Sequence, residues 1–182
     1  MKHIRVGLGL LAGVAAWLSF GQDCHDLQGC KAMGSVAAAS DASAQPGSQL
    51  INASRAFDGL LGSYASLQAD PGSGGGGIRG TMAGDRVISG KRRAGVLLTA
   101  PPDGQALRVS IATYLNGRVQ DRGSAQAPVL ESSGELCGSG CESRDGMLFY
   151  GIDTELPFNA IEVNLQVAGG SEPLQIRELC HQ

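Results

Sequence analysis

Alternating apolar and polar residues indicate two long strands in the second half of the chain. From Leu107 to Leu115 every second residue is apolar or Thr, and the stretch from Ile161 to Val167 repeats this alternation with polar residues between. A period of two places successive side chains on opposite faces of a strand. Each stretch is therefore predicted to be a strand with one face buried.

Turn residues separate these strands from other apolar runs. Asn116-Gly117 follows the first strand directly, and this dipeptide favours a type I′ hairpin turn because both positions accept a positive φ. The further predicted strands are Ala94–Thr99, Met147–Ile152 and Leu174–Cys180, with turns at Pro101-Pro102, Asp103-Gly104, Asp145-Gly146 and Gly169-Gly170. Short strands between turns predict an all-β fold, an antiparallel β-sandwich or jelly roll.

The N-terminus has the pattern of an export signal. Lys2, His3 and Arg5 precede an apolar run from Val6 to Phe20, which is shorter than the roughly 20 residues of a membrane-spanning helix. We expect residues 1–21 to be a signal peptide that is cleaved, with no transmembrane segment in the mature chain, and the protein to be secreted or periplasmic. A retained anchor and lipidation at Cys24 are the alternatives.

The remaining chain divides into two parts by composition. Residues 22–47 are rich in Ala, Ser, Gly and Gln, which predicts a loosely ordered N-terminal lead-in, and residues 48–182 are expected to form the sandwich. The stretch Pro71–Gly77 is expected to be a flexible surface loop. It is not a predicted phosphate cradle, because no Lys-Ser/Thr pair follows it.

The charge balance argues against nucleic acid as a partner. The chain carries 14 basic and 17 acidic residues, a formal net charge of −3. Lys2 and Arg5 lie in the expected signal peptide, so the mature chain is more acidic still. Nucleic-acid binding surfaces are basic, so no nucleic-acid partner is expected.

All five cysteines follow the expected signal peptide, where an exported chain meets an oxidising environment. We therefore expect disulfides, with one cysteine left over and the pairing undetermined. Soft-metal binding near His25 and His181, and free thiols, are the alternatives. The candidates are Cys24, Cys30, Cys137, Cys141 and Cys180.

Five short motifs together resemble a known family. In chain order they are "NASRAFDGLLGSYASLQ", "RAGVLLTAP", "ATYLNGRVQ", "PFNAIEVNLQVAGG" and "LQIRELC". Their order, over about residues 50–180, resembles secreted bacterial discoidin-like (galactose-binding-like) modules. The resemblance implies an eight-stranded jelly roll that is usually non-catalytic and often binds glycans, lipids or proteins.

The resemblance also implies a calcium site. In such modules an Ala-x-Asp-Gly turn often wraps calcium with the help of a late glutamate, which here correspond to Asp58 and Glu178, while Ser63 takes the place of a usual Thr. Calcium binds six to eight oxygen ligands. Leu60 departs from the pattern, because a second aspartate commonly stands at that position. The alternative is that Asp58 only caps its own turn.

Ligand recognition is expected at loops on one end of the sandwich. Tyr114 is the best candidate for an exposed aromatic ring, whereas Phe149 and Phe158 are expected in the core. Loss of Trp17 with the signal peptide weakens the case for a sugar-stacking platform. The densest cluster of charged residues is also predicted to contribute to ligand binding. The alternative is that it only keeps a sheet edge solvated and prevents pairing with other sheets. The cluster comprises Arg86, Lys91, Arg92 and Arg93.

No catalytic motif is present, so an enzyme is not expected. A two-carboxylate glycosidase would need a pair, and nothing in the sequence pairs the available groups, Glu131, Glu135, Asp153 and Glu155. Two function classes remain. The first is an exported module that recognises a glycan or another surface ligand. The second is a structural or protein-interaction domain of the cell envelope.

Overall fold

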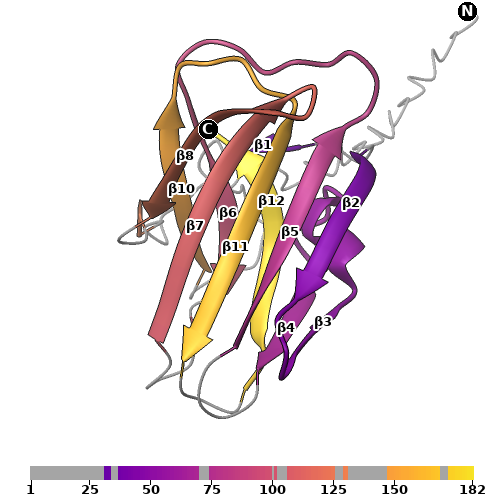
Figure 1. Ribbon diagram of the computed structural model, residues 1–182, viewed down its shortest axis with the longest axis vertical. Coiled ribbons are helices and arrows are strands. Elements are labelled where there is room, and N and C mark those ends of the chain that lie inside the picture. Colours follow the sequence, from indigo (N-terminus) through magenta and orange to yellow (C-terminus); the bar gives the residue numbers. More distant parts are fainter. Residues whose placement is uncertain are drawn as a thin grey trace, which may run out of the picture.

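The computed structural model shows an all-β protein of two antiparallel sheets packed face to face, as the sequence predicts (Figure 1). It describes residues 31–33, 37–69, 74–99, 101, 106–125, 129–130, 147–168 and 172–182. The described part of the chain holds no helix with the length and apolar character that a membrane crossing requires.

The first layer is a five-stranded sheet that faces the viewer in Figure 1. Its central strands are paired along their whole length, so that Val163 lies between Ile78 and Ile111. The order across the sheet is β2 (Ala37–Ala44), β5 (Gly74–Met82), β11 (Ala160–Ala168), β7 (Ala106–Leu115) and β8 (Arg118–Ala125).

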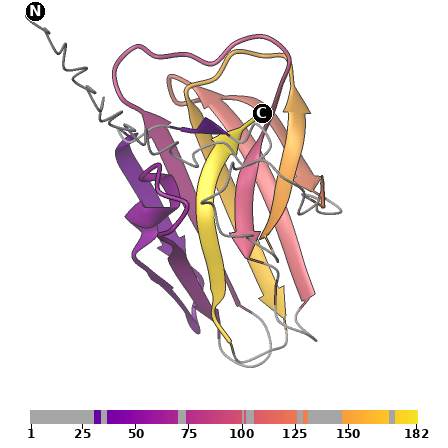
Figure 2. The ribbon, with the colours of Figure 1, turned by 180° about the vertical axis from the view of Figure 1, so that it is seen from behind.

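The second layer is a seven-stranded sheet, which faces the viewer in Figure 2. Consecutive strands repeatedly cross between the two layers, as from β5 to β6 and from β11 to β12, which is the jelly-roll arrangement. The order is β3 (Ser48–Ile51), β4 (Ala65–Ala69), β12 (Leu174–His181), β6 (Arg92–Thr99), β10 (Met147–Thr154) and β9 (Val129–Leu130), with β1 (Lys31–Ala32) paired to the end of β12.

Alternate side chains of the two layers meet in one core, which confirms the predicted periodicity. Val109 and Ile111 of β7 are buried, as are Ile161 and Val163 of β11. Phe158 also lies in this core, whereas Phe149 is buried in a second cluster with Leu61, Leu97 and Cys180. Full burial of one such aliphatic side chain contributes about 1.5–3 kcal/mol to stability.

The predicted hairpin joins β7 to β8. Asn116 has φ of 51° and Gly117 has φ of 80°, so both turn residues occupy the left-handed region that a type I′ turn requires. The side chain of Asn159 holds this tip in place: its Oδ1 accepts a hydrogen bond from the Asn116 backbone N–H at 3.0 Å, and its Nδ2 donates to Asn116 Oδ1 at 3.0 Å.

Three expectations from the sequence need correction. Residues 22–47 are not a loosely ordered lead-in throughout, because Ala37–Ala44 forms β2 and pairs with β5. Of the expected loop Pro71–Gly77, residues 71–73 lie outside the described residues, while Gly74–Gly77 begins β5. The described residues form twelve strands rather than the eight implied by the resemblance. Strands β2 and early β5 are built from small residues and pair through main-chain hydrogen bonds, so they show no apolar alternation.

Candidate functional site

A short 3-10 helix, η1 (Ala53–Phe57), positions the acidic turn. Ala56 and Phe57 are buried and fix η1 to the core. Gly59 follows Asp58 with φ of 77°, a left-handed conformation that glycine adopts without steric cost. The chain therefore reverses directly after Asp58, and the helical start indicated by the sequence extends for only five residues.

The carboxylate of Asp58 organises this turn. Its Oδ1 accepts a hydrogen bond from the Leu60 backbone N–H at 2.8 Å, and its Oδ2 accepts one from the Ser63 hydroxyl at 2.7 Å. The Ser63 oxygen also lies 2.9 Å from the carbonyl oxygen of Leu60 and 3.4 Å from that of Arg55. A hydroxyl group has one hydrogen to donate, so acceptor oxygens outnumber donors around Ser63.

Glu178, near the C-terminus, brings a second carboxylate to the same turn. It lies in β12 just after a register shift, opposite Leu97, and its side chain is fully buried. Among the described residues neither of its carboxylate oxygens receives a well-formed hydrogen bond. An unpaired carboxyl group in such a place is costly to ionise.

The surroundings of Glu178 favour its protonated form. Burial, followed by the negative charge of Asp58, raises the pKa of Glu178 from 4.5 to about 8, although the backbone N–H of Gly59 opposes the shift. Removal of the carboxyl group from water and the approach of a like charge act in the same direction on an acid. Glu178 therefore keeps its proton at neutral pH unless a cation replaces that proton.

The oxygen atoms around this turn fit a hard cation such as calcium. The carboxylates of Asp58 and Glu178 and the carbonyls of Arg55 and Leu60 are all oxygen donors, as calcium prefers. Leu60 stands where discoidin-like modules commonly have a second aspartate, and its side chain is exposed. Its main-chain carbonyl oxygen nevertheless lies beside the Ser63 hydroxyl, so this position still provides an oxygen. Within the described residues no three His, Cys, Asp or Glu side chains converge, so carbonyl, hydroxyl and water oxygens are needed to complete the shell. The three predicted metal residues lie together, and calcium binding itself stays a prediction.

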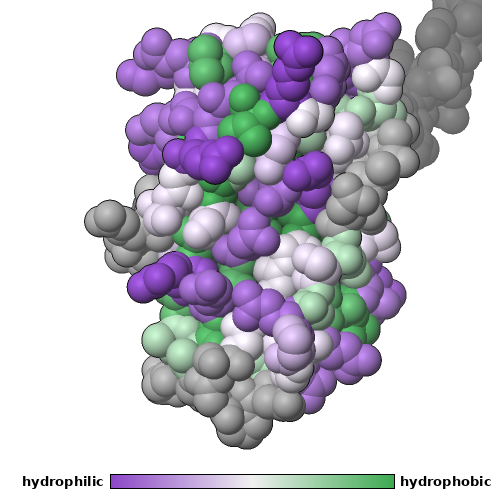
Figure 3. Space-filling view, viewed as in Figure 1, coloured by the Kyte–Doolittle hydropathy of each residue, from purple (hydrophilic) through white to green (hydrophobic). Residues whose placement is uncertain are grey.

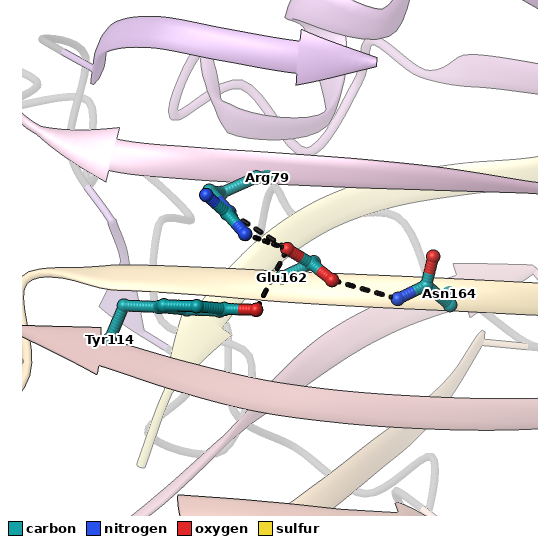
Figure 4. A network of polar contacts seen from close by, with 4 residues as sticks. All are labelled: Arg79, Tyr114, Glu162 and Asn164. Atoms are coloured by element: carbon teal, nitrogen blue, oxygen red, sulfur yellow. Dashed lines mark hydrogen bonds and ion pairs between the residues drawn. The ribbon is translucent and has the colours of Figure 1, made fainter. Parts of the chain in front are cut away.

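A second polar arrangement lies on the outer face of the five-stranded sheet (Figure 4). The Glu162 carboxylate in β11 accepts hydrogen bonds from Arg79 Nε at 2.8 Å and from the Tyr114 hydroxyl at 3.0 Å, and it forms an ion pair with the Arg79 guanidinium. Its other oxygen accepts a hydrogen bond from Asn164 Nδ2 at 3.0 Å. The three strands β5, β7 and β11 thus contribute to one network.

The electrostatics of this network keep Glu162 ionised. Partial burial by itself would raise the pKa of Glu162, but hydrogen bonds from Arg79, Asn164 and Tyr114 outweigh it and lower the pKa below the usual value. The Arg79 guanidinium also lies over the Tyr114 ring, 4.0 Å from the ring centroid, a cation–π contact. Each side chain is consequently held by at least one other.

The predicted ligand-binding residues do not form one group. Tyr114 is half-buried and Arg79 covers one side of its ring, so it is less free than its position on a polar strand face indicated. Arg86 and Lys91 are exposed in the connection between β5 and β6, while Arg92 and Arg93 begin β6 in the opposite sheet. Arg93 pairs with Asp153 at 3.1 Å. Their role in binding stays a prediction.

The remaining candidates are partly outside the described residues. Cys24, Cys30, Cys137 and Cys141 lie outside them, as do Glu131 and Glu135. Cys180 is fully buried near the end of β12 and is not a free thiol. Disulfide connectivity therefore stays a prediction.

Sequence reasoning missed Arg79, Glu162 and Asn164. The alternation of β11 already placed Glu162 and Asn164 on its polar face. Their meeting with Arg79 depends on the register between β5 and β11, which the sequence pattern does not contain.

No protein-family model matches the chain, and no curated protein matches it. Two solved structures resemble the fold. One is the enzymatically active domain of tailspike protein 4 from bacteriophage CBA120, with 12% identity and a TM-score of 0.45 over 79% of this chain, which spans 19% of the tailspike chain. The other is TmCBM61 in complex with β-1,4-galactotriose, with 8% identity and a TM-score of 0.35 over 81% of this chain and 90% of the other. Similarity at this level gives no information on function.

Proposed function

We propose that this protein is a non-catalytic binding module that recognises a glycan or another polar surface ligand on the outer face of its five-stranded sheet. The observation that supports this proposal is the open, hydrogen-bonding character of that face. Figure 3 shows it largely covered by hydrophilic and neutral residues, and the network around Glu162 fixes several of its polar groups.

Sugars suit such a surface because each hydroxyl group both donates and accepts hydrogen bonds. Side chains held by one another lose little conformational entropy when a ligand binds. The opposite sheet offers a different environment, since Leu97, Phe149 and Cys180 are buried in a second apolar cluster. This asymmetry favours the five-stranded sheet as the binding layer.

A binding role without catalysis agrees with the state of four of the described carboxylates. Glu162 is engaged by Arg79, Tyr114 and Asn164, and Asp153 is paired with Arg93. Asp58 lies in the turn after η1 and Glu178 is buried in β12, so neither carboxylate lies on the open face. A general acid or base must reach the substrate directly or through one water molecule, which these arrangements do not favour.

Calcium is the proposed structural cofactor. Asp58 and Glu178 would supply carboxylate oxygens, with carbonyl oxygens of Arg55 and Leu60 beside them. The cation would compensate the negative charge of the buried Glu178 carboxylate. Because Asp58 and Glu178 lie far apart in the sequence, a shared cation would tie the η1 turn to β12 and stabilise the sandwich.

Export through the N-terminal signal is part of the same proposal. Extracellular fluid and the periplasm contain both surface glycans and an oxidising environment in which cysteines pair. These compartments also suit a calcium-dependent fold.

Affinity gel electrophoresis of the purified protein tests the proposed function. Its migration is measured in gels that contain neutral polysaccharides (galactan, xylan, mannan and β-glucan) or anionic ones (polygalacturonate and alginate), with albumin as the non-binding reference. We expect at least one polysaccharide to retard the protein relative to albumin. Equal mobility in every gel would contradict the proposal. Specific capture of an envelope protein by the same preparation would then support the structural or protein-interaction class.

A further inference from the structure

The outer face of the five-stranded sheet contains a furrow over the first half of β5. Gly75 and Gly77 point outward there and have no side chains, so the neighbouring side chains approach over bare backbone. The resulting hollow has a volume of about 140 Å³. Its polar lining residues are Ser43, Gln45, Ser110, Asn164 and Gln166, and glycine, Ala44 and Leu165 complete the lining.

The furrow continues toward the lower end of the sheet in Figure 1. A second hollow of about 530 Å³ shares Gln45 and Gln166 with the first and adds Arg108 and Leu107 of β7. Together they cross from β2 over β5 and β11 to β7, three inter-strand spacings or about 14 Å. A hollow of this shape suits a chain of several linked units better than one compact molecule.

The chemistry of the first hollow is uncharged. Its polar lining side chains carry hydroxyl and carboxamide groups, and no lining residue is ionisable. Carboxamides donate and accept hydrogen bonds at once, which complements the hydroxyl groups of a neutral sugar. An anionic ligand would find only Arg108, at the far end, as an opposite charge among the lining residues.

Asn164 is the best positioned group in this furrow. Its Nδ2 donates to Glu162 Oε1 at 3.0 Å, so its carbonyl oxygen is directed over Gly77. A Cβ atom at Gly77 would lie only 2.5 Å from that oxygen and 3.4 Å from Ser43 Oγ. The network of Figure 4 therefore holds one end of the Asn164 amide and leaves the other end above the furrow floor.

We propose that this furrow binds a neutral oligosaccharide chain, with Asn164, Gln166, Gln45 and Ser43 as its hydrogen-bonding residues and Glu162 as the residue that positions Asn164. The proposal rests on the glycan-binding function proposed above. It moves the site from the loops at one end of the sandwich, where Tyr114 and the basic residues were expected to act, to the middle of a sheet face.

Two substitutions test the furrow in the same electrophoretic assay. Asn164→Ala removes the positioned amide, and Gly77→Ala adds a methyl group to the floor where only the end of the exposed Asn164 side chain must move. Each is expected to weaken binding of the retarding neutral polysaccharide by about tenfold or more, which corresponds to ~1.4 kcal/mol. Gln68→Ala, an exposed residue of β4 in the opposite sheet, is the control and is expected to bind like the wild type.

The outcomes separate the furrow from the general function. Melting temperatures close to that of the wild type establish that the variants are folded. If both furrow variants bind like the wild type, or if only Arg92→Ala/Arg93→Ala loses binding, the furrow is wrong and the glycan-binding function stands. If only anionic polysaccharides retard the protein, the assignment of a neutral ligand is wrong and the glycan-binding function stands. Retardation by no polysaccharide overturns the proposed function and the furrow with it.

Discussion

Replacement of Glu178 by Gln is expected to stabilise the metal-free protein above pH 8 and to abolish its stabilisation by calcium. Gln has nearly the shape of the protonated carboxyl group that the buried site favours, and it cannot ionise. It also lacks the charge with which Glu178 would hold a cation. The two effects have opposite signs, so a general loss of folding cannot imitate them.

The pH dependence follows from the raised pKa. The pKa of Glu178 is about 8 in the folded protein, against an ordinary value of 4.5 for a glutamate side chain. An acid with a raised folded pKa contributes stability that is fully present below the unfolded pKa and is lost as the pH rises through the folded pKa. At about 1.4 kcal/mol per pKa unit, the free energy of unfolding of the metal-free wild type should fall by a few kcal/mol across this window.

Calcium should reverse this fall, because it binds the ionised carboxylate and displaces the proton. Saturation at 100 times the dissociation constant adds about 2.7 kcal/mol of stability. The measurement is denaturant unfolding of the wild type and Glu178→Gln, with chelator or millimolar calcium, on both sides of the window.

Glu155→Gln is the matched control, since Glu155 is exposed in the connection after β10, and it should follow the wild type throughout. Equal stabilisation of Glu178→Gln and the wild type by calcium would rule out Glu178 as a ligand. If the free energy of unfolding of metal-free Glu178→Gln depends on pH as that of the wild type does, the raised pKa of Glu178 is contradicted.

Gly95→Ala is expected to cost at least about 3 kcal/mol of stability, at the upper end of the range for overpacked interiors. Gly95 lies in β6 between Gly151 of β10 and Cys180 of β12. A Cβ atom there would be 1.9 Å from the Tyr150 carbonyl oxygen and 2.7 Å from the Gly151 Cα atom. Both are backbone atoms, so β6 and β10 would have to separate and lose ladder hydrogen bonds.

Gly62→Ala is the control for this effect, because a Cβ atom at Gly62 has nothing within 4 Å. Its free energy of unfolding, measured in urea without metal, should stay within about 0.5 kcal/mol of the wild type. If the two variants are equally stable, the close approach of β6 and β10 is wrong.

The strands that the sequence predicted are those whose side chains alternate. The stretches from Leu107 to Leu115 and from Ile161 to Val167 bury one face each, and their large apolar side chains reveal this in the sequence. Strand β2, with the sequence AAASDASA, and the glycine run of β5 contain no such contrast. Their pairing depends on main-chain hydrogen bonds, which the identity of the side chains does not indicate.

The candidate sites were predictable to different degrees. Resemblance to a family placed Asp58, Ser63 and Glu178 in one site, and the structure brings these residues together. The furrow was not predictable, because Ser43, Gly77 and Asn164 come from three strands distant in sequence and meet only through the register of β2, β5 and β11. The alternation in its strand placed Tyr114 on the polar face, but the cover provided by Arg79 depends on the register of β7, β11 and β5.

Equilibrium dialysis against calcium above pH 8 most directly tests whether Asp58 and Glu178 share a cation. The purified wild type and Asp58→Asn are dialysed to equilibrium, and the bound calcium per chain is measured for each. We predict one calcium ion per wild-type chain and none in Asp58→Asn. Absence of bound calcium from the wild type at millimolar free calcium, or equal binding by both proteins, would contradict the assignment.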